Sequence, residues 1–306
     1  MVGAGAHVPI VAALRERRPG LSCRGALHTD VTADDLAWAD TYVGFKRPPA
    51  ATTMGSVRWV HCTGAGVDSW LSPAELDRDI LLTRTSESFG PAIAEWVVAR
   101  VFAVQQQLAD LAAAQAERRW APREIDLVAG TRAVVVGTGD VGRAVATSLA
   151  ALGVTVTGVS RTGASIHPAF RAVHPVSALP ELIGEAQWIV LTVPDTPATR
   201  GLFSRDVMSR CTGAVLINAG RGAVVDEGAL PEALDRHWLR AVALDVFAVE
   251  PLPAASPLWT HPRVMISPHC SGRTTVPAAV AGFLDCLDLL ERGVMPAWVV
   301  DRARGY

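Results

Sequence analysis

Lysine is almost absent from this chain. Lys46 is the only lysine among the 306 residues, and arginine supplies every other permanently charged basic side chain. A Walker-type phosphate loop needs a lysine directly after its glycines, and Schiff-base chemistry needs a lysine amine. The sequence therefore excludes a Walker-type nucleotide site and argues against Schiff-base chemistry elsewhere in the chain.

Net charge and regularly spaced cysteines are also lacking. A formal charge of −2 provides no electrostatic attraction to nucleic acid or to an anionic membrane. The cysteines are odd in number and widely spaced, so neither a disulfide framework nor a metal site is indicated, and reduced thiols are expected. They are Cys23, Cys62, Cys211, Cys270 and Cys286.

Long apolar runs and a secretory signal are missing as well. Glu95 and Arg100 interrupt the best candidate for a membrane span. The first residues have no basic start and contain Pro9, which is unlike a secretory signal, so a cytoplasmic protein is expected. Half of the residues are hydrophobic, and the length suggests two globular domains.

A glycine motif at residues 137–142 organises the rest of the chain. The β-branched run Val134–Val136 precedes it, and helical apolar spacing follows until Gly153. A strand, a glycine turn and a helix in this order favour a dinucleotide site over a purely structural turn. The pyrophosphate would lie at the helix N-terminus. The residues expected to bind it are Gly137, Thr138, Gly139, Asp140, Val141 and Gly142.

The chain before the glycine motif has the pattern of a small α/β unit. Strands are expected at Leu21–Leu27, Thr41–Phe45, Val57–Cys62 and Ile80–Arg84. Helices are expected at Ile10–Arg18 and, capped by Thr32, at Ala33–Ala39. Pro91 suits the start of a helix, and an apolar stripe to Leu111 predicts one long helix, followed by a linker at Arg118–Pro122.

Strands and helices alternate after residue 131, which predicts a parallel, doubly wound sheet. The expected strands are Val154–Val159, Trp188–Val193, Ala214–Asn218, Ala241–Asp245 and Val264–Ser267. A last helix, Pro277–Arg292, can return the chain to the first part. We therefore expect an α/β protein in which a doubly wound Rossmann-type cofactor domain, residues 93–275, is inserted into a smaller flavodoxin-like substrate domain, residues 1–92 and 276–306.

The second strand of the nucleotide unit decides the coenzyme. An NAD site usually has an acidic residue there for the ribose hydroxyls, but Ser160, Arg161 and Thr162 follow instead, and the next acidic residue is Glu181. A guanidinium and two hydroxyls suit a 2′-phosphate. This pattern favours NADP. A solvated loop arginine is the alternative, and NAD remains possible.

Three polar residues follow late strands, where an open parallel sheet places its ligands. Arg221 can bind a carboxylate through two hydrogen bonds. His269 can donate a proton to a carbonyl oxygen, and Glu250 can orient the imidazole. Each also has an ordinary structural interpretation: a helix-end arginine, a surface glutamate and a core histidine.

The local sequences resemble the D-isomer-specific 2-hydroxyacid dehydrogenase family. The matching segments are 216–230, 243–252, 267–269, 194–202, 65–68, 94–95 and 300–306. The resemblance implies that Arg221 binds the substrate, that Glu250 is the paired acid, and that His269 is the acid/base. It also implies that the loop Gly64, Ala65, Gly66 and Val67, which alone could be an ordinary turn, holds the substrate carboxylate. Further cofactor-binding residues implied in this way are Val193, Pro194, Thr199, Ala219, Asp245 and His269.

The resemblance implies a homodimer joined mainly through the nucleotide domains. The long helix and the linker at Trp120 would then reach a neighbouring subunit, although a tryptophan often simply packs. Two departures stand out: the first forty residues have no clear opening strand, and Ser160-Arg161 replaces the acidic end of an NAD-type strand. Formate oxidation is disfavoured, because formate dehydrogenases of the family carry glutamine where Glu250 stands.

These features lead to the hypothesis of an NADP-preferring oxidoreductase for small 2-oxo and D-2-hydroxy acids. Glyoxylate and hydroxypyruvate are the first candidates, by analogy with the family. Two alternatives remain: a nucleotide-sensing, corepressor-like binding protein of the same fold, and a dehydrogenase for a bulkier or phosphorylated acid.

Overall fold

A computed structural model describes residues 7–49, 53–71, 76–85, 89–164 and 167–305. The chain divides into two compact units, one formed by residues 1–89 and 273–306 and the other by residues 90–272. Both divisions fall three residues before the boundaries expected from the sequence. Each unit is an α/β structure built on parallel strands, as expected. No helix in the described ranges is long and apolar enough to cross a membrane.

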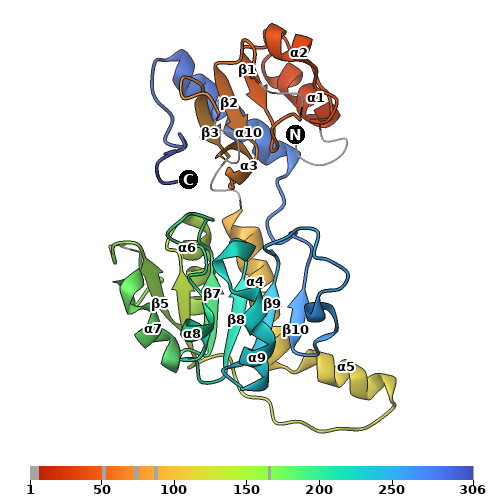
Figure 1. Cartoon of the computed structure of the whole chain (residues 1–306), viewed down its shortest axis with the longest axis vertical. Helices are drawn as coiled ribbons and strands as arrows, with labels where there is room; N and C mark the ends of the chain where they lie inside the picture. The colour runs from red at the N-terminus through yellow and green to blue at the C-terminus, as the bar shows by residue number, and fades with distance from the viewer. Residues whose placement is uncertain (1–6, 50–52, 72–75, 86–88, 165–166, 306) are drawn as a thin grey trace. The chain divides into compact units, whose positions relative to one another are not determined.

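The larger unit contains one parallel sheet of seven strands (Figure 1). Its spatial order is β10-β9-β8-β7-β4-β5-β6, so the strand order reverses between β4 and β7. In such doubly wound sheets, ligands bind at the carboxyl ends of the strands near this reversal. The strands are β4 (Arg132–Val136), β5 (Thr155–Ser160), β6 (Ala172–Pro175), β7 (Trp188–Leu191), β8 (Ala214–Asn218), β9 (Leu239–Leu244) and β10 (Val264–Ile266). Strand β6 was not among those expected from the sequence.

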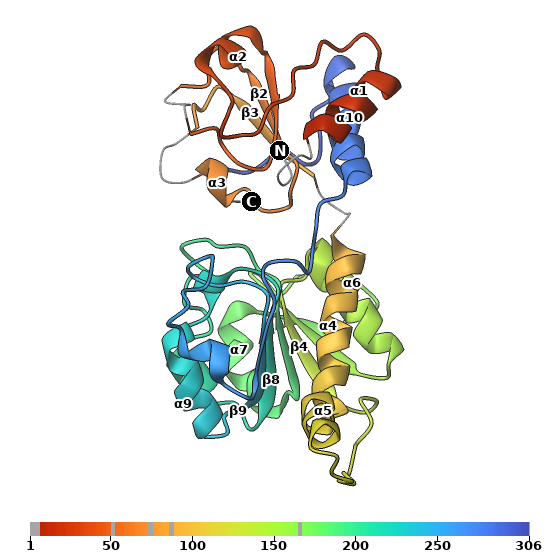
Figure 2. The same cartoon turned by 90° about the vertical axis from the view of Figure 1, so that its right-hand side faces the viewer.

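Helices cover both faces of this sheet (Figure 2). Helices α4 (Gly90–Gln105) and α6 (Asp140–Ala151) pack together on one face, and α7 (Leu179–Leu182) and α9 (Leu230–Asp235) lie on the other, with α8 (Arg205–Met208) packed against α9. Strands β7 and β8 are buried along their whole length. This apolar centre holds the strand ends that carry the candidate site in fixed positions.

The long helix expected after Pro91 is two helices. Helix α4 ends at Gln105, and α5 (Leu108–Ala116) begins after Gln107, whose φ of 50° is left-handed. Side chains from this break bind the returning chain: Gln107 Nε2 donates to the Glu124 carbonyl at 2.9 Å, and Gln105 Nε2 donates to the Asp126 carbonyl at 3.0 Å. These polar contacts offset the cost of interrupting the helix.

The smaller unit has three described strands, β1 (Thr41–Val43), β2 (Trp59–Cys62) and β3 (Leu81–Arg84), paired in parallel in that order. Helices α1 (His7–Arg17) and α10 (Val276–Glu291) share one hydrophobic cluster, and α2 (Ala33–Trp38) and α3 (Asp68–Leu71) contribute to the other. Thr32 caps α2 as expected.

The strand expected at 21–27 is wrong, because these residues are irregular and belong to no described sheet. Leu21 and Cys23 pack against the α1–α10 cluster instead. Their alternating pattern therefore reflects burial of side chains without a ladder of backbone hydrogen bonds.

Candidate active site

The glycine turn lies where β4 enters α6, near the reversal of strand order. Gly137 has φ of 106°, in the left-handed region that favours glycine. A Cβ on Gly142 would lie 1.8 Å from the Gly137 carbonyl oxygen, so only glycine lets the helix pack this close to the turn. At Gly139 a Cβ would meet nothing within 4 Å, which leaves the turn open to an approaching ligand. This geometry fits a pyrophosphate on the N-terminus of the twelve-residue helix α6.

The neighbouring strand β7 supports the same turn. Thr192 Oγ1 donates to the Val136 and Gly137 carbonyls, each at 3.1 Å. The next residues, Val193 and Pro194, enter a loop that Thr199 closes by donating to the Pro194 carbonyl at 2.6 Å. The Ala219 amide donates to the Leu191 carbonyl at 3.1 Å, which keeps the end of β8 beside this loop.

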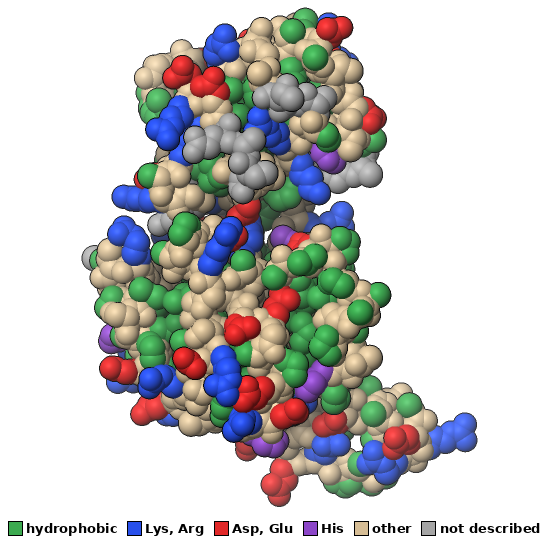
Figure 3. Space-filling view, viewed as in Figure 1, with side chains coloured by type: hydrophobic (Ala, Val, Ile, Leu, Met, Phe, Trp, Pro, Cys, Tyr) green, Lys and Arg blue, Asp and Glu red, His purple; other side chains and the backbone are tan. Residues whose placement is uncertain are grey.

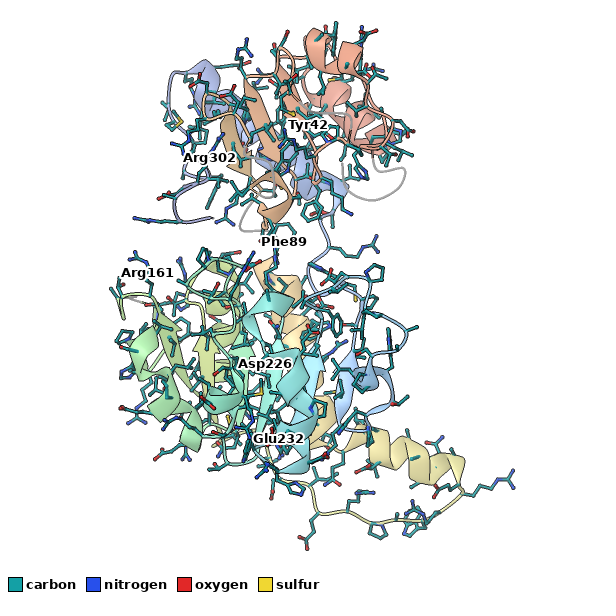
Figure 4. The ribbon with its side chains drawn as sticks, in the orientation of Figure 1. Tyr42, Phe89, Arg161, Asp226, Glu232 and Arg302 are labelled. Atoms are coloured by element: carbon teal, nitrogen blue, oxygen red, sulfur yellow. The ribbon has the colours of Figure 1, made fainter. Side chains whose placement is uncertain are left out.

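Ser160 ends β5, and Arg161 (labelled in Figure 4) and Thr162 follow it. Ser160 Oγ accepts the Gly163 amide at 3.0 Å, which orders the turn. Arg161 is exposed at this carboxyl edge of the sheet. A Cβ on Gly158 would lie 2.9 Å from the Thr138 side chain, so β5 passes directly beside the glycine turn. The sites expected for pyrophosphate and 2′-phosphate thus belong to neighbouring strands.

Arg221, Glu250 and His269 follow three neighbouring strands, β8, β9 and β10. His269 Nδ1 lies 2.8 Å from Glu250 Oε2, so the imidazole and the carboxylate are directly paired. With Nδ1 directed at Glu250, the opposite ring nitrogen, Nε2, is the one that can face a ligand. Both side chains remain partly exposed, at 42% for His269 and 36% for Glu250.

The electrostatics of Glu250 connect all three residues. Burial opposes its ionisation, but hydrogen bonds from His269 and the Phe247 amide outweigh that cost and lower the pKa of Glu250. The charge of Arg221 contributes in the same direction. The structure therefore favours an ionised Glu250 beside the imidazole, with a guanidinium close enough to act on the same carboxylate.

Asn218, the last residue of β8, fixes the approach to Arg221. Its side chain donates to the Arg221 carbonyl at 3.0 Å and accepts the Gly220 amide at 3.1 Å. Arg221 itself donates to the Gly220 carbonyl at 2.7 Å. A short polar side chain at the strand end thus shapes the loop that presents the guanidinium.

Asp245 is fully buried, and its backbone carbonyl accepts the His269 amide. Its carboxylate accepts the Cys270 amide at 3.0 Å, the Ser271 amide at 2.9 Å and the Ser267 hydroxyl at 2.5 Å. Burial opposes ionisation, but the Ser267 and Ser271 side chains and these amides outweigh it and lower the pKa of Asp245. The carboxylate is therefore an anionic anchor for the backbone around His269.

The Gly64–Val67 loop follows β2 in the smaller unit. Thr274 Oγ1 donates to the Thr63 carbonyl at 3.0 Å, and Arg84 donates to the Ala65 carbonyl at 3.0 Å. Because each peptide is trans, fixing these carbonyls directs the Gly64 and Gly66 amides the opposite way. A Cβ on Gly64 would lie 2.4 Å from the Phe45 ring, so this loop has little room for a larger residue.

Residues 98–271, more than half of the chain, match the model of the D-isomer specific 2-hydroxyacid dehydrogenase, NAD binding domain. A relative from Escherichia fergusonii, named glyoxylate/hydroxypyruvate reductase A, is 33% identical over 271 residues, covering 85% of each protein. The chain belongs to the D-isomer-specific 2-hydroxyacid dehydrogenase family. The resemblance inferred from the motifs is thereby confirmed.

Solved structures of the family are similar over nearly the whole chain. A D-isomer specific 2-hydroxyacid dehydrogenase from Xanthobacter autotrophicus, in complex with NADPH and MES, has a TM-score of 0.86 and 29% identity, covering 100% of this chain and 99% of its own. An NADPH-dependent glyoxylate/hydroxypyruvate reductase from Sinorhizobium meliloti, in complex with NADP and sulfate, has a TM-score of 0.86 and 27% identity, covering 98% and 96%.

Several residues around this candidate site were not predicted from the sequence. Asn218 and Ser267 fall inside the motifs that carry the family resemblance, and a polar residue at the end of an apolar strand was the available signal. Glu227 also falls inside such a motif, but neither it nor Trp96 stands at the end of a strand, and their polar contacts lie far away in sequence. Within the described ranges, no group of three or more His, Cys, Asp or Glu residues could hold a metal ion.

Proposed function

We propose that this chain is an NADPH-preferring reductase of small 2-oxo acids such as glyoxylate and hydroxypyruvate, reversible as a D-2-hydroxyacid dehydrogenase. The observation that carries the proposal is the 2.8 Å pair of His269 Nδ1 and Glu250, with Arg221 acting on the same carboxylate. The pair stands at the edge of the sheet where the glycine turn opens. The names of the Escherichia fergusonii and Sinorhizobium meliloti relatives support the choice of substrate.

Arg221 binds the substrate carboxylate in this proposal. A planar guanidinium can give a carboxylate two parallel hydrogen bonds, which fixes both its position and its orientation. The Gly64–Val67 loop of the smaller unit, proposed as the substrate domain, is proposed to bind substrate through its backbone amides. Asn218 acts through Arg221 by holding its backbone.

His269 holds the proton that the substrate oxygen receives. Glu250 stabilises the protonated ring through Nδ1, so Nε2 is the donor to the carbonyl oxygen of a 2-oxo acid. Bound NADPH would supply the hydride to the carbonyl carbon. In the reverse direction the neutral ring accepts the hydroxyl proton at Nε2, while Glu250 favours the charged product form of the imidazole.

The residues of the larger unit, proposed as the cofactor domain, fit a dinucleotide with a 2′-phosphate. Gly137, Gly139 and Gly142 leave the N-terminus of α6 open for a pyrophosphate. Ser160, Arg161 and Thr162 supply a positive charge and two hydroxyls for the 2′-phosphate. Val193, Pro194 and Thr199 follow β7, Ala219 follows β8 and Asp245 follows β9, at the same edge of the sheet as the glycine turn. The NADPH and NADP bound by the two solved relatives support the same preference.

A panel of 2-oxo acids with NADPH and NADH, followed by absorbance, tests the proposal. We expect turnover of glyoxylate or hydroxypyruvate, faster with NADPH. His269→Ala should lower kcat by roughly 10²–10⁴-fold, the usual contribution of a general acid, while coenzyme binding persists. Coenzyme binding without turnover of any acid would instead support a nucleotide-sensing binding protein, and turnover confined to bulky or phosphorylated acids would correct the substrate.

We also propose a cytoplasmic homodimer joined through the larger units. Helix α5 and the returning segment 117–128 project from this unit and carry exposed apolar side chains (Figure 3). Trp120 is 94% exposed and Leu127 76% exposed, which is costly unless a second copy covers them. Sedimentation of the purified protein tests the dimer, and Trp120→Ala together with Leu127→Ser should shift it toward monomer.

A further inference from the structure

Trp96, on helix α4, directs its indole N–H at a polar group within the larger unit. Nε1 donates to Ser267 Oγ at 3.1 Å, across 171 residues of sequence. An indole can only donate, so the Ser267 oxygen accepts this bond and its own proton must turn elsewhere. Asp245 Oδ1, at 2.5 Å, receives that proton. The indole therefore sets the direction of the hydroxyl.

The backbone at His269 needs such support. Its φ of 49° lies in the left-handed region, which strains the backbone of a non-glycine residue. Asp245 holds this conformation from both sides, since its carbonyl accepts the His269 amide at 2.8 Å and its carboxylate accepts the Cys270 and Ser271 amides. A rotation of the Asp245 carboxylate would loosen the segment that carries His269.

We propose that Trp96 is a positioning residue, which acts through Ser267 and Asp245 to hold His269 in its strained conformation for proton transfer. The catalytic part of this proposal rests on the function proposed above. Trp96 itself is held in place, because the Arg100 guanidinium lies 4.2 Å from the centroid of its ring. A tryptophan that served only as packing would need neither the Ser267 bond nor its alignment with Asp245.

Bulk water has little access to this hydrogen bond. Ser267 is 6% exposed and Asp245 is fully buried, so a hydroxyl released by Trp96 has few other partners. Without the indole, the Ser267 oxygen loses the donor that fixes its orientation, so the hydroxyl holds the Asp245 carboxylate less firmly. Phenylalanine at position 96 keeps an aromatic ring but removes the donor together with part of the ring volume, so Trp96→Phe tests the polar role when it is compared with the same change at a second tryptophan.

Trp188 provides a matched control. It is fully buried at the start of β7, and its Nε1 donates to another hydroxyl, Thr131 Oγ1, at 2.9 Å. Trp188→Phe removes the same kind of bond from the same unit, at the opposite ends of the strands. In Trp96→Phe we expect kcat for the preferred 2-oxo acid to fall about five- to tenfold, with KM for the acid and coenzyme affinity within about twofold. Trp188→Phe should keep kcat within about twofold.

Variants of Ser267 test the same connection. Ser267→Thr keeps the hydroxyl and should retain most of kcat, whereas Ser267→Ala should lose as much as Trp96→Phe. The double variant Trp96→Phe/Ser267→Ala should be no slower than Ser267→Ala alone, because both changes break one chain of hydrogen bonds. Additive losses would overturn the proposal.

Hydrogen–deuterium exchange reads the positioning without any substrate. Amides in the segment 267–272 should exchange faster in Trp96→Phe than in the unmodified protein. In Trp188→Phe their exchange rates should be the same as in the unmodified protein. Equal exchange in that segment for Trp96→Phe and the unmodified protein, or an equal loss of kcat in Trp188→Phe, would overturn the proposal. If the unmodified protein turns over no 2-oxo acid, the proposed function fails, while the exchange comparison still decides whether Trp96 holds this segment.

Discussion

Glu227 and Glu250 bind neighbouring amides of one loop. Glu227 Oε1 accepts the Ala248 amide at 2.6 Å, and Glu250 Oε1 accepts the Phe247 amide at 3.0 Å. Two carboxylates thus hold the segment that places Glu250 against His269. Burial raises the pKa of Glu227; the bond from Ala248 opposes this, and repulsion from Glu250 adds to it. Glu227 and Glu250 therefore hold the loop around Phe247 and Ala248, but the two carboxylates repel each other.

We expect Glu227→Gln to stabilise the folded protein at pH 8. A carboxyl whose pKa is raised by folding favours the folded state below its unfolded pKa and loses that contribution as pH rises through the folded value. Glutamine keeps the acceptor for Ala248 and removes the charge. The unfolding temperature should therefore rise by roughly 1–3 °C at pH 8 and change little at pH 4.

Glu227→Ala is the matched control, because it removes both the charge and the acceptor. It should unfold at a lower temperature than Glu227→Gln at every pH, since the Ala248 amide then loses its partner. Equal unfolding temperatures of the two variants across the pH range would contradict the role assigned to this hydrogen bond.

Glu250→Gln should change the pH dependence of the reaction. The pKa of Glu250 is lowered in the folded protein, so its ionised form contributes stability above the unfolded value, and this contribution is lost as pH falls through the folded value. At neutral pH the carboxylate is therefore charged and supports the protonated imidazole. Without that charge, reduction of the 2-oxo acid should decline at a lower pH than in the unmodified enzyme.

Profiles of kcat/KM for the 2-oxo acid between pH 5 and pH 9 measure this shift. Glu250→Gln should also lower kcat at pH 7 by roughly tenfold or more, since the amide orients the ring less firmly than a carboxylate. Superimposable profiles for the variant and the unmodified enzyme would separate Glu250 from proton transfer.

Arg161→Asp should reverse the coenzyme preference toward NADH. The guanidinium is proposed to bind the 2′-phosphate, and a charge-assisted contact of about 1.5–3 kcal/mol corresponds to a ten- to more than a hundredfold preference. An aspartate would repel the phosphate and accept bonds from the ribose hydroxyls of NADH. The ratio of kcat/KM values for NADPH and NADH measures the change.

Arg171→Asp is the control for this charge reversal. Arg171 is also exposed, but it precedes β6, at the opposite end of the strands from the loop after β5. It should leave the NADPH/NADH ratio within about twofold while changing the net charge by the same amount. Equal shifts in both variants would mean that the general field, and no local contact of Arg161, sets the preference.

The convergence of Arg221, Glu250 and His269 was predictable from the chain because each follows a short apolar strand. The alternation of strands and helices makes a parallel sheet, and a parallel sheet gathers the residues after its strands at one edge. The glycine motif was equally predictable, since the tight turn and the close packing at Gly142 leave no other residue type.

Features that depend on distant partners were not predictable. The apolar stripe from Ala94 to Leu111 spans the position where the helix is interrupted. There, the side chain of Gln105 binds the carbonyl of residue 126 and that of Gln107 binds the carbonyl of residue 124. The alternation of apolar and polar residues at 21–27 would form a strand only beside a neighbouring strand that pairs with its backbone. Leu21 and Cys23 pack against the cluster of α1 and α10 instead. The bond between Trp96 and Ser267 arises only when α4 packs near the end of β10.

Gly222→Ala should lower activity strongly, although the substitution adds only one methyl group. A Cβ at Gly222 would lie 1.9 Å from the Phe247 carbonyl carbon and 2.2 Å from the Ala248 nitrogen, so backbone must move. The displaced segment leads to Glu250, and the glycine itself follows Arg221. We expect kcat/KM for the 2-oxo acid to fall by about 10²-fold, because misplacing catalytic groups by about 1 Å has that effect, and stability to fall by about 1–3 kcal/mol.

Gly228→Ala is the control, since its Cβ would meet only Asp226 Oδ1, at 3.5 Å, and its kcat/KM should stay within about twofold of that of the unmodified enzyme. Near-normal turnover in Gly222→Ala would show that the spacing between the Arg221 and Glu250 loops does not limit the reaction.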